Sequence, residues 1–336
     1  MKRFHVNIPI FIPHLGCPNM CVFCNQRAIS GVCSFIPEIA RETIESHLST
    51  LCGRSATCEI AFFGGSFTGI DRELMINLLD LAEEYVSQGD VSGIRMSTRP
   101  DYINEEIIDI LGKYTISAVE LGIQTMSDEV LRLSKRGHTA ETSRTAVQML
   151  REAGFSVVGQ MMVGLPGSTR EDEVHTAQEI CLLGCSAARI YPTIVFRETE
   201  LADMMAKGEY QPLSLDEAVS RSADILEVFL NSNIECIRIG LCESENLHSD
   251  ETYISGPSHP SMGELVYGEI FYKKMCALLD GINPAVAITF GVSRGETSKA
   301  VGQKKRNINR ICEKYSIRKV RVIERDDISP YTVVLF

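Results

Sequence analysis

Residues 16–26 read GCPNMCVFCNQ and place three cysteines in the pattern C-x3-C-x2-C near the start of the chain. The cysteines are Cys17, Cys21 and Cys24, and the aromatic Phe23 directly precedes the last of them. Three thiols this close together are compatible with a disulfide fragment, a zinc site or an iron–sulfur site. The spacing alone does not decide between these, so the fold and the chemistry have to be read from the rest of the sequence.

The composition describes an ordinary globular protein. The 336 residues suffice for one large α/β domain and a smaller one, and 44% hydrophobic with 23% charged residues is typical of a soluble chain. No apolar run approaches the roughly 18 residues that suggest a membrane span. Polar residues and prolines interrupt the stretch after Lys2 and Arg3, which argues against a signal peptide. We therefore expect a cytoplasmic protein, in which reduced, clustered thiols favour metal over disulfides.

The net charge of −11 is unevenly distributed. Residues 294–325 contain 11 Lys and Arg against 3 Asp and Glu, a local charge of +8 that leaves −19 for the remainder. A segment of this kind can bind a polyanion such as tRNA. It is equally typical of a solvated helix and an edge strand, and both interpretations remain open.

Strand-like and helix-like segments alternate over the first 240 residues. Short apolar runs predict strands at 6–12, 59–63, 93–97, 117–123, 155–163 and 187–196, with apolar residues at helical spacing between them. Ser168 with Glu171 and Ser214 with Glu217 are capping-box patterns that predict two helix starts. Alternation of this kind predicts a parallel sheet, open or closed into a barrel.

The regular alternation of predicted strands and helices ends at about residue 240. A loop rich in proline precedes a predicted helix at 263–279, a strand at 285–290, a basic helix at 296–315 and strands at 317–324 and 332–336. We predict two regions, an α/β domain over residues 1–240 and a small α+β appendage over residues 241–336.

Unusual residues follow each predicted strand of the first region. They are the cysteine stretch, FFGGSFTG at 62–69, STRPD at 97–101, ELGIQT at 120–125, MVGLPG at 162–167, and Tyr191 with Pro192. Each motif alone is weak evidence, since a glycine pair or a GLPG turn is usually only a turn. Parallel barrels collect their chemistry at the carboxyl ends of the strands, so the six together predict one ligand-binding rim.

This order of motifs resembles the radical S-adenosylmethionine enzymes over roughly residues 9–240, and the cysteine pattern is the most specific mark of that family. CPNMCVFCNQ, GGSFTG, VELGIQT, RGHT, IRIGL and HPSMGELV look most like the Elongator catalytic subunit and its bacterial relatives. The oxygen-independent coproporphyrinogen oxidases are more distant. The resemblance implies a partial, TIM-like (βα) barrel with a small C-terminal α+β appendage.

The resemblance also implies a site. Cys17, Cys21 and Cys24 would ligate a [4Fe-4S] cluster, and three thiolates leave its fourth iron open. That iron would bind S-adenosyl-L-methionine, and an electron from a donor such as ferredoxin or flavodoxin would cleave it to a 5′-deoxyadenosyl radical. The matching positions imply further cofactor contacts: Phe23 near the adenine; Gly64, Gly65 and Ser66 at the methionine end; Ser97 and Arg99 near the ribose or carboxylate; Gln124 and Arg136 as hydrogen-bonding groups; and Gly159, Gln160 and Tyr191 as weaker candidates.

This sequence departs from the family at several of these positions. Ser66 stands where relatives often have an acidic residue or Thr, and Ser97 and Gln160 replace carboxylates. Cys33 is not expected as a fourth ligand, because four protein ligands would close the reactive iron. The other cysteines are interpreted as small hydrophobes and His14, His138 and His259 as packing or surface residues.

Three functions are compatible with these observations. The first is an Elongator-like modifier of the wobble uridine of tRNA, with tRNA held by residues 294–325. The chain shows no acyl-CoA-binding glycine loop and ends at Phe336, so we expect a separate acyl-transfer partner or a different reaction. The second is a radical enzyme acting on a small molecule such as a tetrapyrrole. The third is a zinc-stabilised binding module, for which no fourth ligand is evident.

Overall fold

The computed structural model describes residues 4–12, 15–17, 21–25, 35–51, 56–241, 251–282 and 286–336. His14, Cys33, Cys52 and Cys242 lie outside these ranges. Among the helices described, none has both the length and the apolar character that crossing a membrane requires.

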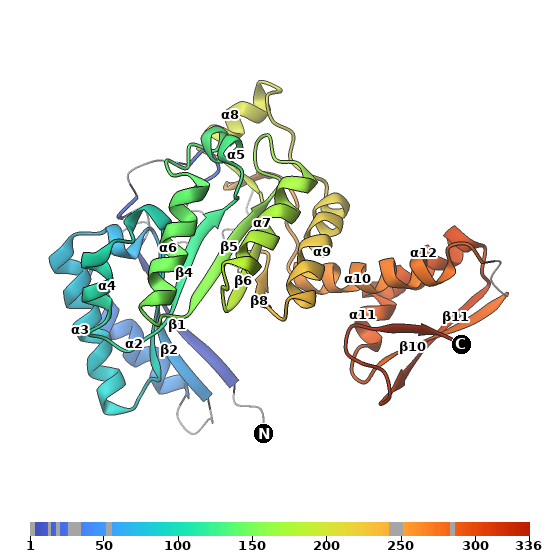
Figure 1. Ribbon diagram of the computed structural model, residues 1–336, viewed down its shortest axis with the longest axis horizontal. Coiled ribbons are helices and arrows are strands. Elements are labelled where there is room, and N and C mark those ends of the chain that lie inside the picture. The colour runs from blue at the N-terminus through green and yellow to red at the C-terminus, as the bar shows by residue number, and fades with distance from the viewer. Residues whose placement is uncertain are drawn as a thin grey trace.

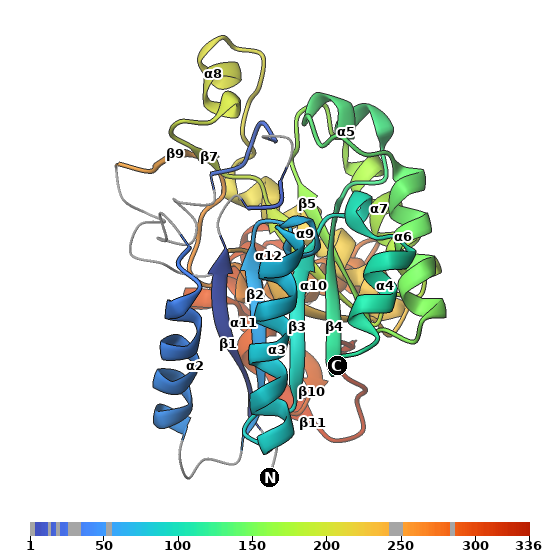
Figure 2. The same cartoon turned by 90° about the vertical axis from the view of Figure 1, so that its left-hand side faces the viewer.

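A seven-stranded sheet forms the larger part of the molecule (Figures 1 and 2). Its strands are β1 (Phe4–Ile12), β2 (Ala56–Gly64), β3 (Gly93–Thr98), β4 (Ile116–Gln124), β5 (Val157–Val163), β6 (Ala187–Pro192) and β8 (Glu235–Ile239). They pair in the order β1-β2-β3-β4-β5-β6-β8, and every pair is parallel. Because consecutive strands are neighbours and each connection crosses the same face, the sheet curls into a half-barrel.

Helices connect the strands, and most of them cover the outer face of this half-barrel, whereas α5 and α8 lie beyond the ends of the strands (Figures 1 and 2). They are α2 (Glu38–Leu51), α3 (Arg72–Gln88), α4 (Glu105–Leu111), α5 (Asp128–Leu133), α6 (Ala140–Glu152), α7 (Arg170–Leu182), α8 (Glu200–Ala206) and α9 (Leu215–Asn231), with short 3-10 turns η1 (Phe67–Gly69) and η2 (Pro100–Tyr102). The apolar faces of α2, α3, α4, α6, α7 and α9 pack on the strands to form the main core, which includes Ile60, Leu79, Leu121, Ile180 and Phe229. Leu201 of α8 belongs to a smaller cluster with Val22, Val195 and Tyr210.

Three details of this region differ from the sequence-based predictions. The segment 187–196 is interrupted: β6 ends at Pro192, which has no N–H to continue the ladder, and β7 (Val195–Phe196) pairs instead with β9 (Tyr253–Ser255). Strand β8 was not predicted, because its residues are half-exposed rather than a buried apolar run. Helix α7 is capped by Thr169 with Asp172, not by Ser168 with Glu171. Ser214 caps α9 as predicted, accepting the Glu217 N–H at 3.2 Å.

The C-terminal region is a small mixed sheet with helices on one side. It contains α10 (Met262–Leu279), β10 (Ala287–Ser293), α11 (Thr297–Val301), η3 (Gln303–Lys305), α12 (Arg306–Tyr315), β11 (Lys319–Arg325) and β12 (Val333–Leu335). The strand order is β11-β10-β12, with β11 parallel and β12 antiparallel to β10. The predicted α/β partial barrel with an α+β appendage is therefore confirmed.

The predicted continuous basic helix at 296–315 is wrong. Gly302 has a φ of +73°, and the Asn307 side chain donates hydrogen bonds to the Lys299 and Ala300 carbonyls at 3.3 and 3.2 Å. These carbonyls belong to the last turn of α11, so Asn307 satisfies acceptors that a longer helix would have used. The chain then turns and starts α12 as a separate helix.

Helix α10 joins the two regions (Figure 1). Its first half, including Val266 and Ile270, lies in the main core, and its second half, including Phe271 and Met275, lies in the core of the small sheet. A helix shared in this way does not mark a sharp division, and the boundary at residue 240 stays a prediction.

Candidate functional site

A cavity of about 280 Å³ opens inside the curl of the large sheet, at the carboxyl ends of its strands. Nearly all the residues singled out from the sequence line it, although they come from separate segments. They are Cys17, Cys21, Phe23, Cys24, Gly64, Gly65, Ser97, Arg99, Gln124, Arg136, Gln160 and Tyr191. The predicted rim is therefore a single cavity wall.

The cysteine loop is held against the end of β2 by close backbone contact. The Gly65 N–H donates to the Ile12 carbonyl at 2.7 Å, and the Ser66 N–H donates to the Leu15 carbonyl at 3.0 Å. A Cβ at Gly65 would lie 2.0 Å from the Leu15 oxygen, and a Cβ at Gly16 would lie 2.2 Å from the Ser66 oxygen. No side chain fits between these two backbones, so glycine at both positions lets the loop dock. The space beside Gly65 is thus filled by the backbone of the cysteine loop, at the Leu15 and Ile12 carbonyl oxygens.

The three thiols lie in a cationic environment. Cys21 is buried, Cys17 and Cys24 are partly exposed, and Arg136 Nη1 donates to Cys21 Sγ at 3.4 Å. Burial raises the pKa of the Cys17 thiol, and the positive charges of Arg136 and Arg99 oppose that shift. Nearby guanidinium groups favour thiolates, which are the form that ligates iron.

The thiols are not grouped as they would be around one ion. Among the residues described, no three His, Cys, Asp or Glu side chains are placed to hold a single metal ion. A cubane is ligated at three different irons, so its thiolates stand further apart than the ligands of one zinc ion.

Arg136 is held in place by Arg99. The Arg99 guanidinium donates to both Asp101 carboxylate oxygens at 2.9 and 2.8 Å and to the Arg136 carbonyl at 2.6 Å. Arg136 in turn donates through Nη2 to the Gly122 carbonyl at 2.7 Å, at the end of β4. This chain of contacts fixes one guanidinium on the cavity wall and leaves it little freedom to turn.

Gln124 sits in a strained backbone position at the end of β4. Its φ is +67°, and the pairing register between β4 and β5 shifts between Gly122 and Gln124. A non-glycine residue rarely adopts this conformation, which is maintained only where the surroundings impose it. The Gln124 side chain is thereby placed on the cavity wall.

Four buried polar atoms on this wall have no hydrogen-bond partner within the described residues. They are Arg99 Nη1, Gln124 Oε1, Arg136 Nε and Arg189 Nε. Unpartnered buried groups cost free energy, so their gathering in one cavity fits a polar ligand that supplies both donors and acceptors. A ligand with an amino and a carboxylate group, such as S-adenosylmethionine, matches this need.

Sequence reasoning did not single out Glu120 and Arg189, which also line the cavity. Glu120 accepts hydrogen bonds from Arg95 at 2.9 Å and from Arg189 at 2.7 Å. Arg189 also donates to Tyr191 Oη at 3.3 Å; burial works against its charged form, but Tyr191 and Glu120 outweigh that effect and raise the pKa of its guanidinium. The sequence did contain a sign of these residues, because each is a charged residue inside an otherwise largely apolar strand, Glu120 in β4 and Arg189 in β6.

Several candidate residues lie behind the wall instead. Ser66 is fully buried and hydrogen-bonds Thr98 Oγ1 at 2.8 Å. A Cβ at Gly159 would meet Ile180 of α7 at 2.8 Å, so Gly159 faces the outer helix layer and not the cavity. His138 is buried, and its Nδ1 lies 3.2 Å from the Thr139 carbonyl oxygen. Burial and the charge of Arg136 lower the pKa of His138 to about 4.

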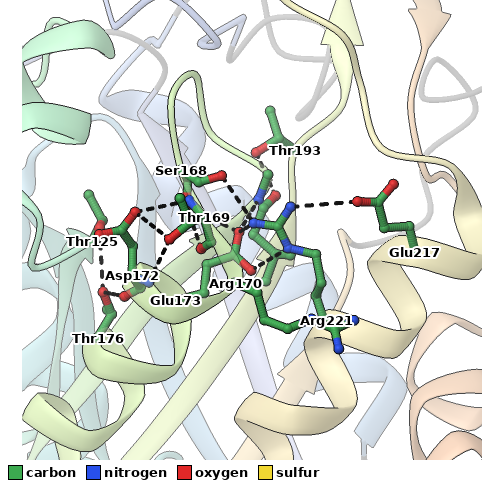
Figure 3. A network of polar contacts seen from close by, with 12 residues as sticks. Thr125, Ser168, Thr169, Arg170, Asp172, Glu173, Thr176, Thr193, Glu217 and Arg221 are labelled. Atoms are coloured by element: carbon green, nitrogen blue, oxygen red, sulfur yellow. Dashed lines mark hydrogen bonds and ion pairs between the residues drawn. The ribbon is translucent and has the colours of Figure 1, made fainter.

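A buried ion pair fixes the loop that follows β5, as Figure 3 shows. Glu173 of α7 accepts the Gly164 N–H at 2.7 Å and two hydrogen bonds from Arg221 of α9, at 2.8 and 2.7 Å. Arg221 also donates to the Ser168 carbonyl at 3.1 Å. The GLPG motif is therefore an anchored turn that closes one side of the rim.

Comparison with known proteins agrees with this geometry. The model described as "Radical SAM superfamily" matches residues 11–180, and that described as "Radical_SAM C-terminal domain" matches residues 185–271. Protein MJ0486 of Methanocaldococcus jannaschii is 32% identical over 239 residues, which cover 67% of this chain and 72% of that protein. The tRNA uridine(34) acetyltransferase of Methanocaldococcus infernus is 37% identical over 200 residues, covering 53% of this chain but only 36% of that enzyme.

Two solved structures share the fold. The archaeal Methanocaldococcus infernus Elp3 with an N-terminal deletion superposes with a TM-score of 0.63 at 23% identity, covering 81% of this chain and 64% of that one. Coproporphyrinogen III oxidase (HemN) from Escherichia coli, a radical SAM enzyme, gives a TM-score of 0.50 at 18% identity, covering 69% and 53%. The cysteine loop, the cavity wall and the match over half of the chain lead to one assignment: the protein belongs to the radical SAM superfamily, enzymes that use a [4Fe-4S] cluster and S-adenosylmethionine.

Proposed function

We propose that Cys17, Cys21 and Cys24 ligate three irons of the cluster and leave the fourth to S-adenosylmethionine. The support is the convergence of these thiols with three guanidinium groups and four polar atoms that have no partner within the described residues, all on one cavity wall. When bound, the cluster and S-adenosylmethionine supply a 5′-deoxyadenosyl radical, for which radical SAM enzymes need an external reductant. We propose ferredoxin or flavodoxin as that reductant.

The chain's own residues would bind and orient the cofactor. Arg136, held by Arg99, is placed to receive a carboxylate, and Gln124 offers an amide with a free oxygen. Gln160 and Tyr191 stand on neighbouring strands of the same wall and complete the enclosure. Water is excluded by the aromatic and aliphatic members of the lining, including Phe23, which protects a reactive radical from side reactions.

The substrate that we propose is tRNA, modified at the wobble uridine. The support is the similarity, over about half of this chain, to tRNA uridine(34) acetyltransferases, together with the basic C-terminal segment. This chain spans about a third of those enzymes. We therefore propose that acyl transfer, if the reaction includes it, is supplied by a separate partner.

Reconstitution without oxygen tests the cofactor assignment. We expect the protein to take up iron and sulfide and to produce 5′-deoxyadenosine from S-adenosylmethionine and a reductant. Cys17→Ala, Cys21→Ala and Cys24→Ala should each abolish that product. Cys276→Ala, at a buried thiol in the core of the small sheet, should retain it. A colourless protein that binds zinc and leaves S-adenosylmethionine intact contradicts the assignment.

The nucleosides of a deletion strain test the substrate. We expect one modified uridine to disappear from the anticodon position of its tRNA, and tRNA lacking that modification to be changed by the reconstituted enzyme. Unchanged nucleosides together with an accumulated tetrapyrrole would instead support the small-molecule alternative.

A further inference from the structure

Helices cover only one face of the small C-terminal sheet; on the other face Ile328, from the loop before β12, lies over Gly291. Ile288, Phe290 and Val292 of β10, with Val320 and Val322 of β11, pack into the core formed with helices α10, α11 and α12. Side chains alternate along a strand, so the intervening residues point to the opposite face. No helix or strand of the described chain contributes to a core on that face, which we call the open face.

The open face is basic along β11. Lys319, Arg321 and Arg325 alternate with the core-facing residues and are all exposed. Arg321 pairs in register with Thr289 of β10, and the Phe336 N–H donates to the Thr289 carbonyl at 2.9 Å. A cation, a hydroxyl and an aromatic residue therefore lie in one row across the sheet.

Phe336 supplies an aromatic surface on this face. The residue is 58% exposed, and a Cβ at Gly291 would lie 2.5 Å from the ring carbon Cε2. The glycine thus leaves room for the ring to lie on the sheet itself. The Arg325 guanidinium stands 5.4 Å from the ring centroid, a cation–π distance. An exposed ring beside arginines is costly to leave in water and suited to stacking.

The cations of residues 294–325 divide into two classes. Six are in ion pairs: Arg294, Lys299, Arg306, Arg310, Lys314 and Arg325. Lys304, Lys305, Arg318, Lys319 and Arg321 form no ion pair within the described ranges. The helical cations Arg306 and Arg310 are held by Asp216 and Glu269. The free charge of the segment is therefore found partly on the open face, in an otherwise acidic protein.

We propose that the open face, defined by Lys319, Arg321, Arg325 and Phe336, binds unpaired nucleotides of an RNA. Lys319 and Arg321, which form no ion pair within the described chain, contact phosphates, and the Phe336 ring, beside Arg325, stacks on a base. Charge complementarity favours this occupant, because a local positive surface on a chain of net charge −11 selects a polyanion. The inference rests on the proposed tRNA substrate and locates its binding outside the cavity, on the sheet rather than on the basic helix.

A matched pair of double variants tests the surface. Lys319→Gln with Arg321→Gln removes two open-face charges, and Lys304→Gln with Lys305→Gln removes two equally unpaired charges from the helix side. Affinity for bulk tRNA is measured by filter binding from low to high salt. We expect the first double variant to weaken binding about tenfold and to reduce the salt slope by about 1.4–1.8, the value for two phosphate contacts. The second should change affinity less than about threefold.

The outcomes separate the two proposals. No salt-sensitive tRNA affinity in the unmodified protein contradicts the proposed substrate. Wild-type affinity that survives in Lys319→Gln/Arg321→Gln, or that falls equally in both double variants, overturns only the open face as the binding surface. A concentration-dependent dimer that the first double variant dissociates would also overturn it, because the face would then bind a second copy.

A reporter at Phe336 tests stacking directly. The chain contains no tryptophan, so Phe336→Trp introduces a single indole on the open face. We expect poly(U) to quench its emission and to saturate it at the concentration that saturates binding. Phe336→Ala should weaken poly(U) binding at least about fivefold, as loss of one stacked base does. Unchanged emission throughout the titration would overturn the stacking role.

Discussion

The large and the small sheet place their cations in opposite environments. Inside the half-barrel, Arg99 and Arg189 are buried and each is held by a carboxylate. On the open face of the small sheet, Lys319 and Arg321 are in water without an ion-pair partner in the described chain. A buried guanidinium must be paired to be tolerated, whereas an exposed one keeps its hydration. The buried arginines of the half-barrel therefore hold the cavity wall in place, whereas the exposed cations of the small sheet remain available to bind a partner.

The largest effect is expected at the buried pair next to the GLPG turn. Arg221→Ala leaves the Glu173 carboxylate, whose side chain is 2% exposed, without its counter-charge. Breaking such a pair by removing one partner costs about 3–5 kcal/mol of unfolding free energy. Urea denaturation followed by circular dichroism measures it.

Arg306→Ala is the matched control in the other region. Its partner Asp216 is 74% exposed, so the loss should stay below about 1 kcal/mol. Equal losses of unfolding free energy in Arg221→Ala and Arg306→Ala would contradict the difference between buried and exposed ion pairs.

The next effect is expected where the cysteine loop docks. Gly65→Ala forces a Cβ to within 2.0 Å of the Leu15 carbonyl oxygen, so the loop must move. We expect a loss of about 2–3 kcal/mol, as for overpacking, together with reduced iron uptake on reconstitution. Gly263→Ala in α10, where the nearest atom is 3.9 Å away, should be neutral or slightly stabilising. Full iron uptake by Gly65→Ala would show that the loop does not depend on this contact.

A pH effect of about 2 kcal/mol is expected from His138. Its pKa is about 4 in the folded protein against an ordinary value of 6.5, because burial and Arg136 disfavour the charged ring. As pH falls below 6.5 the unfolded chain takes up this proton and the folded chain does not, so stability falls, by about 2 kcal/mol from pH 7 to pH 5.

Comparison of variants isolates the His138 contribution. His138→Gln should remove that part of the pH dependence, and His175→Gln, at an exposed histidine, should leave it in place. The assignment to His138 fails if the difference between wild type and His138→Gln is the same at pH 7 and pH 5.

The sequence was most informative about the half-barrel. Buried parallel strands are continuous apolar runs, and the motifs that follow them all lie at one edge, so the strands and the rim could be predicted before any coordinates. Twelve positions predicted for the cofactors line the cavity. Strand β8 was not predicted, because it is an edge strand that contains Glu235 and Arg238 and is therefore not an apolar run.

Other features depend on tertiary contact and could not be predicted. The pairing of Glu120 with Arg189 joins strands that are not sheet neighbours, so it depends on the curl of the sheet. Ser66 belongs to a rim motif, but the turn after β2 buries its hydroxyl against Thr98 Oγ1 and keeps it out of the cavity lining. In the basic segment, only the folded arrangement separates cations that have an acidic partner from those that have none.

The smallest effect is expected on the open face. Lys319→Gln with Arg321→Gln removes neighbouring like charges that have no acidic partner in the described chain, so little attraction is lost and some repulsion is relieved. We expect the unfolding free energy to change by less than about 0.5 kcal/mol, the range for surface substitutions away from structural features. The same variant should lose tRNA affinity, so denaturation and binding measured on one preparation separate the two roles. A loss of stability above about 1 kcal/mol would show that these cations support the sheet itself. In that case the cations of the small sheet would stabilise the fold, as the buried arginines of the half-barrel do.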